Sequence, residues 1–237
     1  MSFWLIIIFN MKIRIKIIIL IITCVLFSVL GYYLYVGSSS NEESIDINDE
    51  YYSEWDKYYE INNDYIGHIV FDSNIINLPV LQANDNDYYL RRNINKEYDI
   101  KGIPFIDYRC SLNDQNIIIY GHYIKKGSQE MFTPLEKLID SRDNDSLQLR
   151  LRTSIRQYKL VSILIVDGEN NDNYPFLLQN YSQSEINILN DYIKENSIYS
   201  SNDSITLNDS ILTLITCTND MNEFREIAIF KEIWWCS

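Results

Sequence analysis

The sequence is poor in the residues that mark several classes of protein. Its 237 residues include only 7 glycines, 4 prolines and 4 cysteines, which excludes a collagenous chain, a low-complexity chain and a small disulfide-dense domain. Basic side chains are outnumbered, 20 against 33 acidic ones, and the formal net charge is −13. That charge disfavours nucleic acid and anionic polymers as partners. Hydrophobic residues form 46% of the chain, enough for one sizeable core.

Acidic residues are absent from the first 36 positions, where the only charges are Lys12, Arg14 and Lys16. The rest of the chain carries 17 basic and 33 acidic side chains, a net charge of −16. Residues 17–36 form an uncharged, mostly apolar run, which is long enough as a helix to cross the roughly 30 Å hydrocarbon core of a membrane. Because basic residues precede the run and acidic residues follow it, the sequence predicts a single-pass anchor with residues 1–16 in the cytoplasm and the remaining chain outside the cell.

A cleaved signal peptide is the alternative for this segment, since it too combines basic residues with an apolar run. The run is long for a signal peptide, and no small-residue cleavage pattern precedes Gly37. Residues 1–10 are also apolar and lie ahead of the basic cluster, which is unusual for both kinds of segment. Translation from Met11, which would open the protein with MKIRIK, is a hypothesis that accounts for this.

Residues 37–50 are small, polar and acidic, which is typical of a solvated linker. We expect the extracellular domain to occupy residues 51–237. It opens with Tyr51, Trp55 and Tyr58 at helical spacing, which predicts an amphipathic helix that packs onto the domain. Core packing is a commoner role for such an aromatic stripe than ligand binding.

From Tyr65 onward, eight short runs rich in β-branched residues alternate with turn residues, which predicts a mainly β domain, either a barrel or a sandwich. Two segments with helical periodicity interrupt the runs, at residues 128–140 and 182–196. The second begins with Ser182 and Glu185, which have the spacing of a capping box. The domain is therefore expected to be β with flanking helices.

Cysteine and histidine are too few and too scattered to predict a metal site, because the chain has no CxxC and no HExxH pair. No cofactor is implied either. Cys24 lies in the apolar run. Cys110 and Cys236 could pair as a disulfide in an oxidising exterior or stay as thiols, a choice that the sequence leaves open.

Three reactive side chains stand at the ends of predicted strands. His122 follows an apolar strand through Gly121, Cys217 closes another strand, and Arg225 opens the last one. The rim of a barrel could gather them in a loop-lined site. Taken alone, a cysteine that ends an apolar strand is more often a small buried residue than a nucleophile. The other histidine, His68, lies in an alternating run and is interpreted as structural.

The motifs around these residues resemble those of the sortase family. TLITC at 213–217 is similar to the TLxTC signature of sortases, NIIIYGHYI at 116–124 resembles the strand that delivers their catalytic histidine, and Arg225 stands at the place of their essential arginine. The three motifs also follow one another in the family's order. Further segments resemble class B sortases in particular: 76–90, 101–109 and 130–138. The likeness covers nearly all of residues 65–234.

The resemblance implies an eight-stranded sortase β-barrel with an N-terminal helix and a helix between strands 6 and 7. It also implies a membrane-anchored cysteine transpeptidase, which cleaves a C-terminal sorting signal after Thr and transfers the acyl group to an amine of the peptidoglycan cross-bridge or of lipid II. The partners would then be secreted proteins that bear the sorting motif and become anchored to the cell wall of a Gram-positive bacterium.

The resemblance also implies a role for each site residue, and elementary chemistry agrees with it. Cys217 would be the nucleophile, because a thiolate attacks a carbonyl carbon without a strong adjacent base. His122 would be the general acid and base, and Arg225 would stabilise the oxyanion with a charged, planar donor. Tyr120 and Thr216 resemble residues of the family's substrate groove, although an edge aromatic and a strand threonine would look the same.

Two departures from the family pattern leave the sorting motif open. Ile215 stands where class B enzymes commonly have Ser, and only seven residues separate Cys217 from Arg225. A signal of the NPQTN, SPxTG or NPxTG type is compatible with the chain.

The sequence also leaves rival functions to be tested. A papain-like peptidase or cell-wall amidase places its Cys before its His, whereas His122 precedes Cys217 by 95 residues. An L,D-transpeptidase would carry a His-Gly-Cys motif, which the chain lacks. The non-enzymatic rival is a membrane-anchored binding ectodomain in which Cys217 is merely buried.

Overall fold

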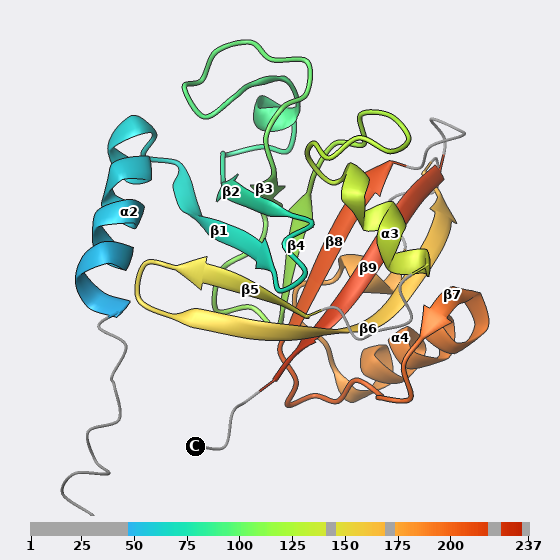
Figure 1. Ribbon diagram of the computed structural model, residues 1–237. Helices are drawn as coiled ribbons and strands as arrows, with labels where there is room; N and C mark the ends of the chain where they lie inside the picture. Colours follow the sequence, from blue (N-terminus) through green and yellow to red (C-terminus); the bar gives the residue numbers. More distant parts are fainter. Residues whose placement is uncertain (1–46, 141–145, 169–173, 218–223, 234–237) are drawn as a thin grey trace, which may run out of the picture. The chain divides into compact units, whose positions relative to one another are not determined.

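The computed structural model describes residues 47–140, 146–168, 174–217 and 224–233. The predicted anchor at residues 17–36 lies outside these ranges. Within them, no helix has the length and the apolar character needed to cross a membrane. The chain divides into two compact units, Met1–Tyr51 and Tyr52–Ser237, and the second contains the whole of the sheet (Figure 1).

The described part of the chain contains nine strands and six helical segments. The strands are β1 (Tyr65–Phe71), β2 (Asn77–Leu81), β3 (Phe105–Ile106), β4 (Asn116–Tyr120), β5 (Ser146–Leu151), β6 (Ile155–Asp167), β7 (Ser197–Ser200), β8 (Ile211–Cys217) and β9 (Phe224–Glu232). The α-helices are α2 (Ile47–Ile61), α3 (Glu136–Asp140) and α4 (Gln183–Asn196), and the short 3-10 helices are η1 (Tyr88–Arg91), η2 (Thr133–Leu135) and η3 (Pro175–Leu177).

Eight of the strands close into a barrel. Their order is β5-β1-β2-β3-β4-β8-β9-β6, and the pairing of β5 with β6 joins the two ends. The β2–β3 and β4–β8 pairs are parallel, whereas the other neighbours run antiparallel. The ninth strand, β7, extends the sheet from β6. The predicted eight-stranded barrel is therefore confirmed, with one short strand added that the sequence does not reveal.

Burial explains the hydrophobic patterns of the strands. In β1 and β5, buried residues alternate with partly exposed ones, because successive side chains point to opposite faces of a strand. Ile117, Ile118 and Ile119 of β4 are all buried, as expected for a strand that is covered on both faces. The continuous apolar run before His122 thus belongs to an interior strand of the barrel.

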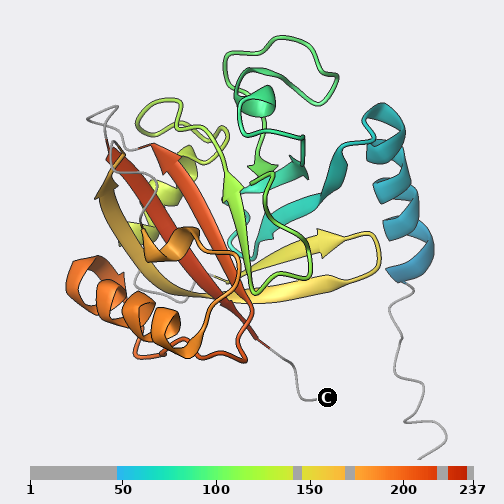
Figure 2. The same cartoon turned by 180° about the vertical axis from the view of Figure 1, so that it is seen from behind.

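The two long helices that the sequence predicted are confirmed. Helix α2 begins at Ile47, inside the predicted linker, and buries Trp55, whose Nε1 donates to the carbonyl of Ile66 at 3.3 Å. Helix α4 follows β6 and lies beside it (Figure 2). Ser182 and Glu185 form its capping box, as predicted.

The helix predicted at residues 128–140 is shorter than expected. Its described helical part is η2 followed by α3, and it begins only at Thr133. Met131 adopts a positive φ of 52°, a left-handed conformation that cannot continue a right-handed helix. Pro134 then occupies the first turn, where a missing backbone N–H is tolerated.

Candidate active site

The turn that carries His122 is held on both sides. Gly121 donates from its amide to the carbonyl of Ile215 at 3.0 Å, and the amide of Phe132 donates to the carbonyl of His122 at 3.0 Å. A Cβ atom on Gly121 would come within 2.4 Å of Cγ of Phe132, whose ring is fully buried. Close packing against Phe132 therefore requires glycine directly before His122.

The imidazole of His122 is fixed by a backbone group from η1. Its Nε2 atom lies 2.7 Å from the carbonyl oxygen of Leu90. Because a carbonyl oxygen can only accept, Nε2 must carry a proton, and a neutral imidazole keeps Nδ1 as its acceptor. Sequence reasoning did not identify Leu90, and the signal that could have found it is its place at the end of the family-like segment 76–90.

Cys217 and Arg225 lie opposite one another at the ends of neighbouring strands. Cys217 closes β8, and the antiparallel register of β8 and β9 pairs it with Arg225. In the parallel pair β4–β8, Tyr120 lies opposite Ile215. The turn with His122 and the end of β8 with Cys217 therefore meet at one rim of the barrel. The side chain of Cys217 itself lies outside the described part of the structure.

A cavity of about 120 Å³ lies at this rim. Four of the five residues predicted for the site contribute to its wall: Tyr120, His122, Thr216 and Arg225. The fifth, Cys217, is next to it through its pairing with Arg225. Thr216 is buried, and its hydroxyl has no hydrogen-bond partner among the described residues.

A larger cavity of about 520 Å³ adjoins the first one. The two cavities share five wall residues: Leu90, Phe105, Tyr120, Ile215 and Arg225. On the other side, the larger cavity is bounded by the segment 174–179, which includes η3. The two cavities together form one groove, called the rim groove below, with the three candidate catalytic positions at one end.

Comparison with known proteins agrees with this geometry. Residues 72–230 match the sortase domain. The chain belongs to the sortase family. The sortase B of Listeria monocytogenes is 32% identical to it over an alignment of 187 residues, and the match covers 74% of this chain and 71% of the relative.

Solved structures of class B sortases have the same fold as this chain. The sortase B of Clostridium perfringens has a TM-score of 0.67 and 26% identity, over 76% of this chain and 99% of that one. A sortase B–substrate complex from Staphylococcus aureus has a TM-score of 0.66 and 24% identity, over 87% of this chain and 93% of that one. The chain is thus a sortase B-like cysteine transpeptidase, of the kind that anchors surface proteins.

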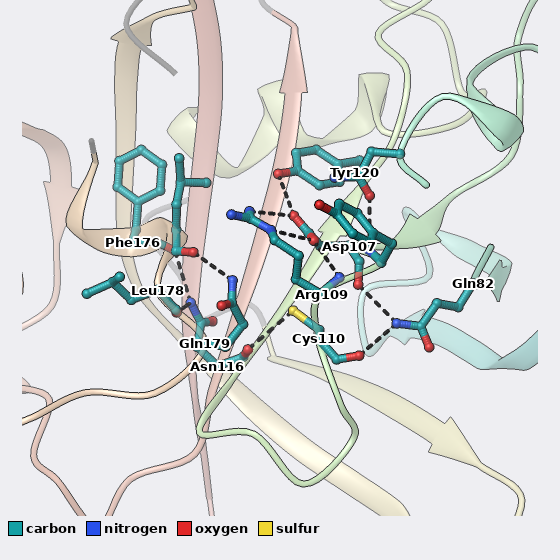
Figure 3. Close-up of polar contacts among 12 residues, drawn as sticks. Gln82, Asp107, Arg109, Cys110, Asn116, Tyr120, Phe176, Leu178 and Gln179 are labelled. Carbon is teal, nitrogen blue, oxygen red and sulfur yellow. Dashed lines mark hydrogen bonds and ion pairs between the residues drawn. The ribbon is translucent and has the colours of Figure 1, made fainter. Parts of the chain in front are cut away.

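A buried carboxylate supports one wall of the rim groove. Asp107 is fully buried and accepts at Oδ1 from Nε of Arg109 at 3.0 Å and at Oδ2 from Nη2 at 2.8 Å. The hydroxyl of Tyr120 donates to the same Oδ2 at 3.1 Å (Figure 3). Burial alone would raise the pKa of Asp107, but the hydrogen bonds and the charge of Arg109 lower it below its ordinary value. Burial, and next the charge of Asp107, raise the pKa of Tyr120, so its phenol stays neutral.

A buried amide holds the opposite wall. Asn116, at the start of β4, is fully buried, and its Nδ2 donates to the carbonyls of Phe176 and Leu178 at 2.9 Å each. Its Oδ1 accepts from the hydroxyl of Thr213 at 2.9 Å. Figure 3 shows this amide between β4 and the segment that contains η3. Asn116 therefore ties a groove wall to β4, the strand that leads to His122.

The remaining histidine and the described free cysteine do not line the groove. His68 lies with Nδ1 2.6 Å from the hydroxyl of Tyr65, and burial, followed by the charge of Arg150, lowers its pKa to about 4. This neutral, packed histidine agrees with the structural role predicted. Cys110 is a free buried thiol, and burial raises its pKa to about 11, whereas Cys236 lies outside the described residues. No metal-binding cluster occurs in the part of the sortase that the structure describes.

Proposed function

We propose that this sortase cleaves a C-terminal sorting signal after Thr and transfers the acyl group to a peptidoglycan amine, of the cross-bridge or of lipid II. One observation carries the proposal. His122 and Arg225 share the wall of one small cavity, and strand register pairs Arg225 with Cys217. Nucleophile, proton carrier and cationic donor are the three groups that acyl transfer through a thioester requires.

The first half-reaction forms the acyl-enzyme. The thiolate of Cys217 attacks the carbonyl carbon of Thr, and the negative charge that develops on the carbonyl oxygen is stabilised by the guanidinium of Arg225. As the C–N bond breaks, the departing amine takes a proton from the imidazolium of His122. Because Nε2 is bound to the carbonyl of Leu90, Nδ1 is the nitrogen that gives this proton. The products are a thioester on Cys217 and the released C-terminal peptide.

The second half-reaction resolves the thioester. An incoming amine loses a proton to Nδ1 of His122 and attacks the thioester carbonyl. The C–S bond breaks, so that the Cys217 thiolate and the His122 imidazolium return to their starting state. Water in place of the amine gives hydrolysis. Tyr120 and Thr216, which line the cavity, are proposed to contact the bound peptide.

The anchor predicted at residues 17–36 completes the proposal. A helix of that length would hold the enzyme at the membrane surface, and the charge asymmetry along the chain would place the catalytic domain outside the cell. Secreted proteins that carry a sorting signal and the growing cell wall meet at that surface. The partners are therefore a peptide signal and a wall amine.

The test is a panel of fluorogenic sorting peptides that varies the residues around Thr, read by mass spectrometry with and without an added amine. We expect cleavage after Thr, an amine-linked product when amine is present, and labelling of Cys217 by a methanethiosulfonate reagent with loss of activity. Cys217→Ala should cleave nothing while keeping the melting temperature of the wild type. Full cleavage by Cys217→Ala would overturn the assignment.

The same panel separates the rival functions. A cysteine peptidase or amidase would give only the hydrolysed product at every amine concentration. A binding ectodomain would cleave no peptide, and its Cys217 would resist alkylation because it is buried.

A further inference from the structure

Arg109 lines the rim groove and is a cation without a role in the proposed reaction. Its side chain is 45% exposed, although the carboxylate that it binds, Asp107, is 0% exposed. Arg109 lines the larger cavity, on a wall that it shares with Tyr120. The ion pair therefore has one member inside the protein and the other at the surface where a ligand would lie.

Only part of the guanidinium is used by Asp107. The pair uses Nε and Nη2 of Arg109, and Nη1 makes no hydrogen bond with any residue that the structure describes. Figure 3 shows Nη1 directed away from Asp107, toward the side of the groove where Phe176 and Leu178 lie. Since a guanidinium has five N–H donors, Arg109 keeps a donor edge that is turned into the groove.

The free donor edge is held in a fixed position. The backbone amide of Arg109 donates to Oδ1 of Asp107 at 2.9 Å. Gln82 donates from Nε2 to the carbonyls of Asp107 at 3.0 Å and of Cys110 at 2.8 Å. Segment 107–110 is thus fixed at both ends, and a ligand that binds Arg109 has little conformational entropy to remove from it.

The surroundings of Arg109 make such a donor selective. Half of the residues that line the larger cavity have apolar side chains, among them Leu90, Phe105, Val166, Phe176, Ile215 and Ile227. In pockets of this composition, the few polar groups fix the orientation of the ligand and decide which ligand is accepted. A ligand atom opposite Nη1 must accept a hydrogen bond, because otherwise Nη1 would lose its hydration without replacement.

We propose that Arg109 is a specificity-determining residue, and that its Nη1 donates to a side-chain oxygen of the sorting peptide at one position beside the cleaved Thr. The inference rests on the proposed function, since it assigns a subsite of the same groove. Both an amide and a carboxylate oxygen offer the required chemistry. Asp107 and the nearby Asp87 balance the charges of Arg109 and Arg225. Charge therefore excludes neither an amide nor a carboxylate side chain on the peptide.

The continuity of the groove favours the peptide over the wall amine as the ligand of Arg109. An extended peptide with its Thr carbonyl between Cys217 and His122 must run along the shared wall of the two cavities. A wall amine that is still protonated would be repelled by a guanidinium. The peptide therefore meets Arg109, whereas the amine gains nothing from it.

The experiment scans each position around Thr in three matched peptides, with an amide, a carboxylate or an isosteric apolar side chain (Gln, Glu or Met). The wild-type enzyme, Arg109→Lys and Arg152→Lys are compared, with kcat/KM for hydrolysis and the ratio of transfer to hydrolysis as readouts. Arg109→Lys keeps a charge for Asp107 but loses the planar fork. Arg152 also pairs with an aspartate, Asp56, at 3.7 Å, and it does not line the groove, which makes it the matched control.

We expect one position at which the apolar peptide is cleaved about 10- to 100-fold less efficiently than the better oxygen-bearing peptide by the wild type and by Arg152→Lys. In Arg109→Lys this difference should fall to a few-fold or less. The comparison of Gln with Glu then tells which oxygen the groove takes.

Three outcomes would overturn the inference. They are the absence of any oxygen-dependent position in the wild type, an equal loss by Arg109→Lys on every peptide, and an effect confined to the transfer ratio. The first needs no variant, so a folding defect in Arg109→Lys cannot hide it. If Cys217-dependent cleavage occurs and one of these outcomes is found, only the subsite is wrong. If no peptide is cleaved, both the proposed function and the proposed subsite are wrong.

Discussion

Cys217 lies directly opposite Arg225 in the antiparallel ladder of β8 and β9, and one position further into the sheet Thr216 lies opposite Glu226. The first pair stands at the rim and the second in the interior. Because strand register sets both pairs, the spacing of Cys217 and Arg225 is a property of the barrel. The short connection between the two strands, a departure from the family pattern, therefore does not separate them.

Arg225→Lys should lose most of the activity. A lysine keeps the positive charge but replaces a planar fork with a point donor on a flexible stem, and loss of one oxyanion donor costs about 10²- to 10³-fold in kcat. Steady-state cleavage of a fluorogenic sorting peptide measures the effect. Lys231→Arg, near the other end of the same strand, is the matched control and should keep wild-type activity. Retention of more than a third of the wild-type rate by Arg225→Lys would contradict the assigned role.

Gly121→Ala should lower both stability and activity. The added methyl group would collide with the buried ring of Phe132 at 2.4 Å, and overpacking of this kind costs about 1–3 kcal/mol. Since His122 follows directly, a shifted turn should also reduce kcat. Gly127→Ala is the control: its φ of 75° is strained for alanine, but nothing lies within 4 Å of the new atom. It should lose some stability and keep its kcat.

The double variant Gly121→Ala/Phe132→Leu tests the cause. A smaller, flexible side chain at position 132 makes room for the methyl group, so part of the lost kcat should return. If kcat of Gly121→Ala stays at the wild-type level, the collision does not move His122.

Much of the fold could be predicted because local patterns and global packing agree. The alternation in β1 and β5 follows from one buried face of each strand. The continuous apolar run of β4 follows from burial on both faces, and the capping box at Ser182 satisfies backbone amides at the start of α4. The added strand β7 could not be predicted, because Ser197–Ser200 has one weak alternation and depends on pairing with β6. The helix predicted at 128–140 is longer than the observed one, since periodicity does not report the backbone conformation of Met131.

The candidate site also contains residues that the sequence could predict and residues that it could not. His122, Cys217 and Arg225 carry reactive groups at strand ends, so residue type and place make them candidates before any geometry is known. Leu90 contributes through its backbone carbonyl, and any residue type could supply that atom. Asn116 acts through contacts 60 or more residues away in the chain, which no local pattern contains.

Asn116→Leu should destabilise the protein and weaken peptide binding. The substitution leaves the buried carbonyl of Phe176 and the partly buried carbonyl of Leu178 without their donor, at a cost of about 2–4 kcal/mol in the free energy of unfolding. Because segment 174–179 forms a wall of the groove, KM should rise by more than kcat falls. Urea unfolding and peptide kinetics on the same preparation measure both effects.

Asn190→Leu provides the comparison for Asn116. Asn190 of α4 donates to the carbonyls of Ile186 at 3.0 Å and Ile205 at 2.8 Å, so it performs a similar bridging task away from the groove. It should lower the free energy of unfolding and leave KM unchanged. A KM increase of similar size in both variants would mean that general destabilisation, and not the groove wall, is responsible.

Glu226→Gln should stabilise the protein at alkaline pH. Glu226 is 3% exposed, and its Oε1 has no hydrogen-bond partner among the described residues. Burial, followed by the charge of Glu136, raises its pKa from the ordinary 4.5 to about 7. Between these two values the folded state holds a proton that the unfolded state has released. The contribution of Glu226 to the free energy of unfolding therefore falls as the pH rises from about 4.5 to 7.

The measurement compares the wild type with Glu226→Gln by urea unfolding at pH 4, 6 and 8, with Glu232→Gln as the control for loss of a negative charge from β9. The amide stays neutral, so the variant should gain nothing at pH 4 and about 1–3 kcal/mol at pH 8, since one pKa unit corresponds to about 1.4 kcal/mol. The gain at pH 6 should be intermediate. A difference between variant and wild type that is the same at all three pH values would show that Glu226 does not titrate in this range. In that case, the buried side chain must have a partner that the described residues do not include.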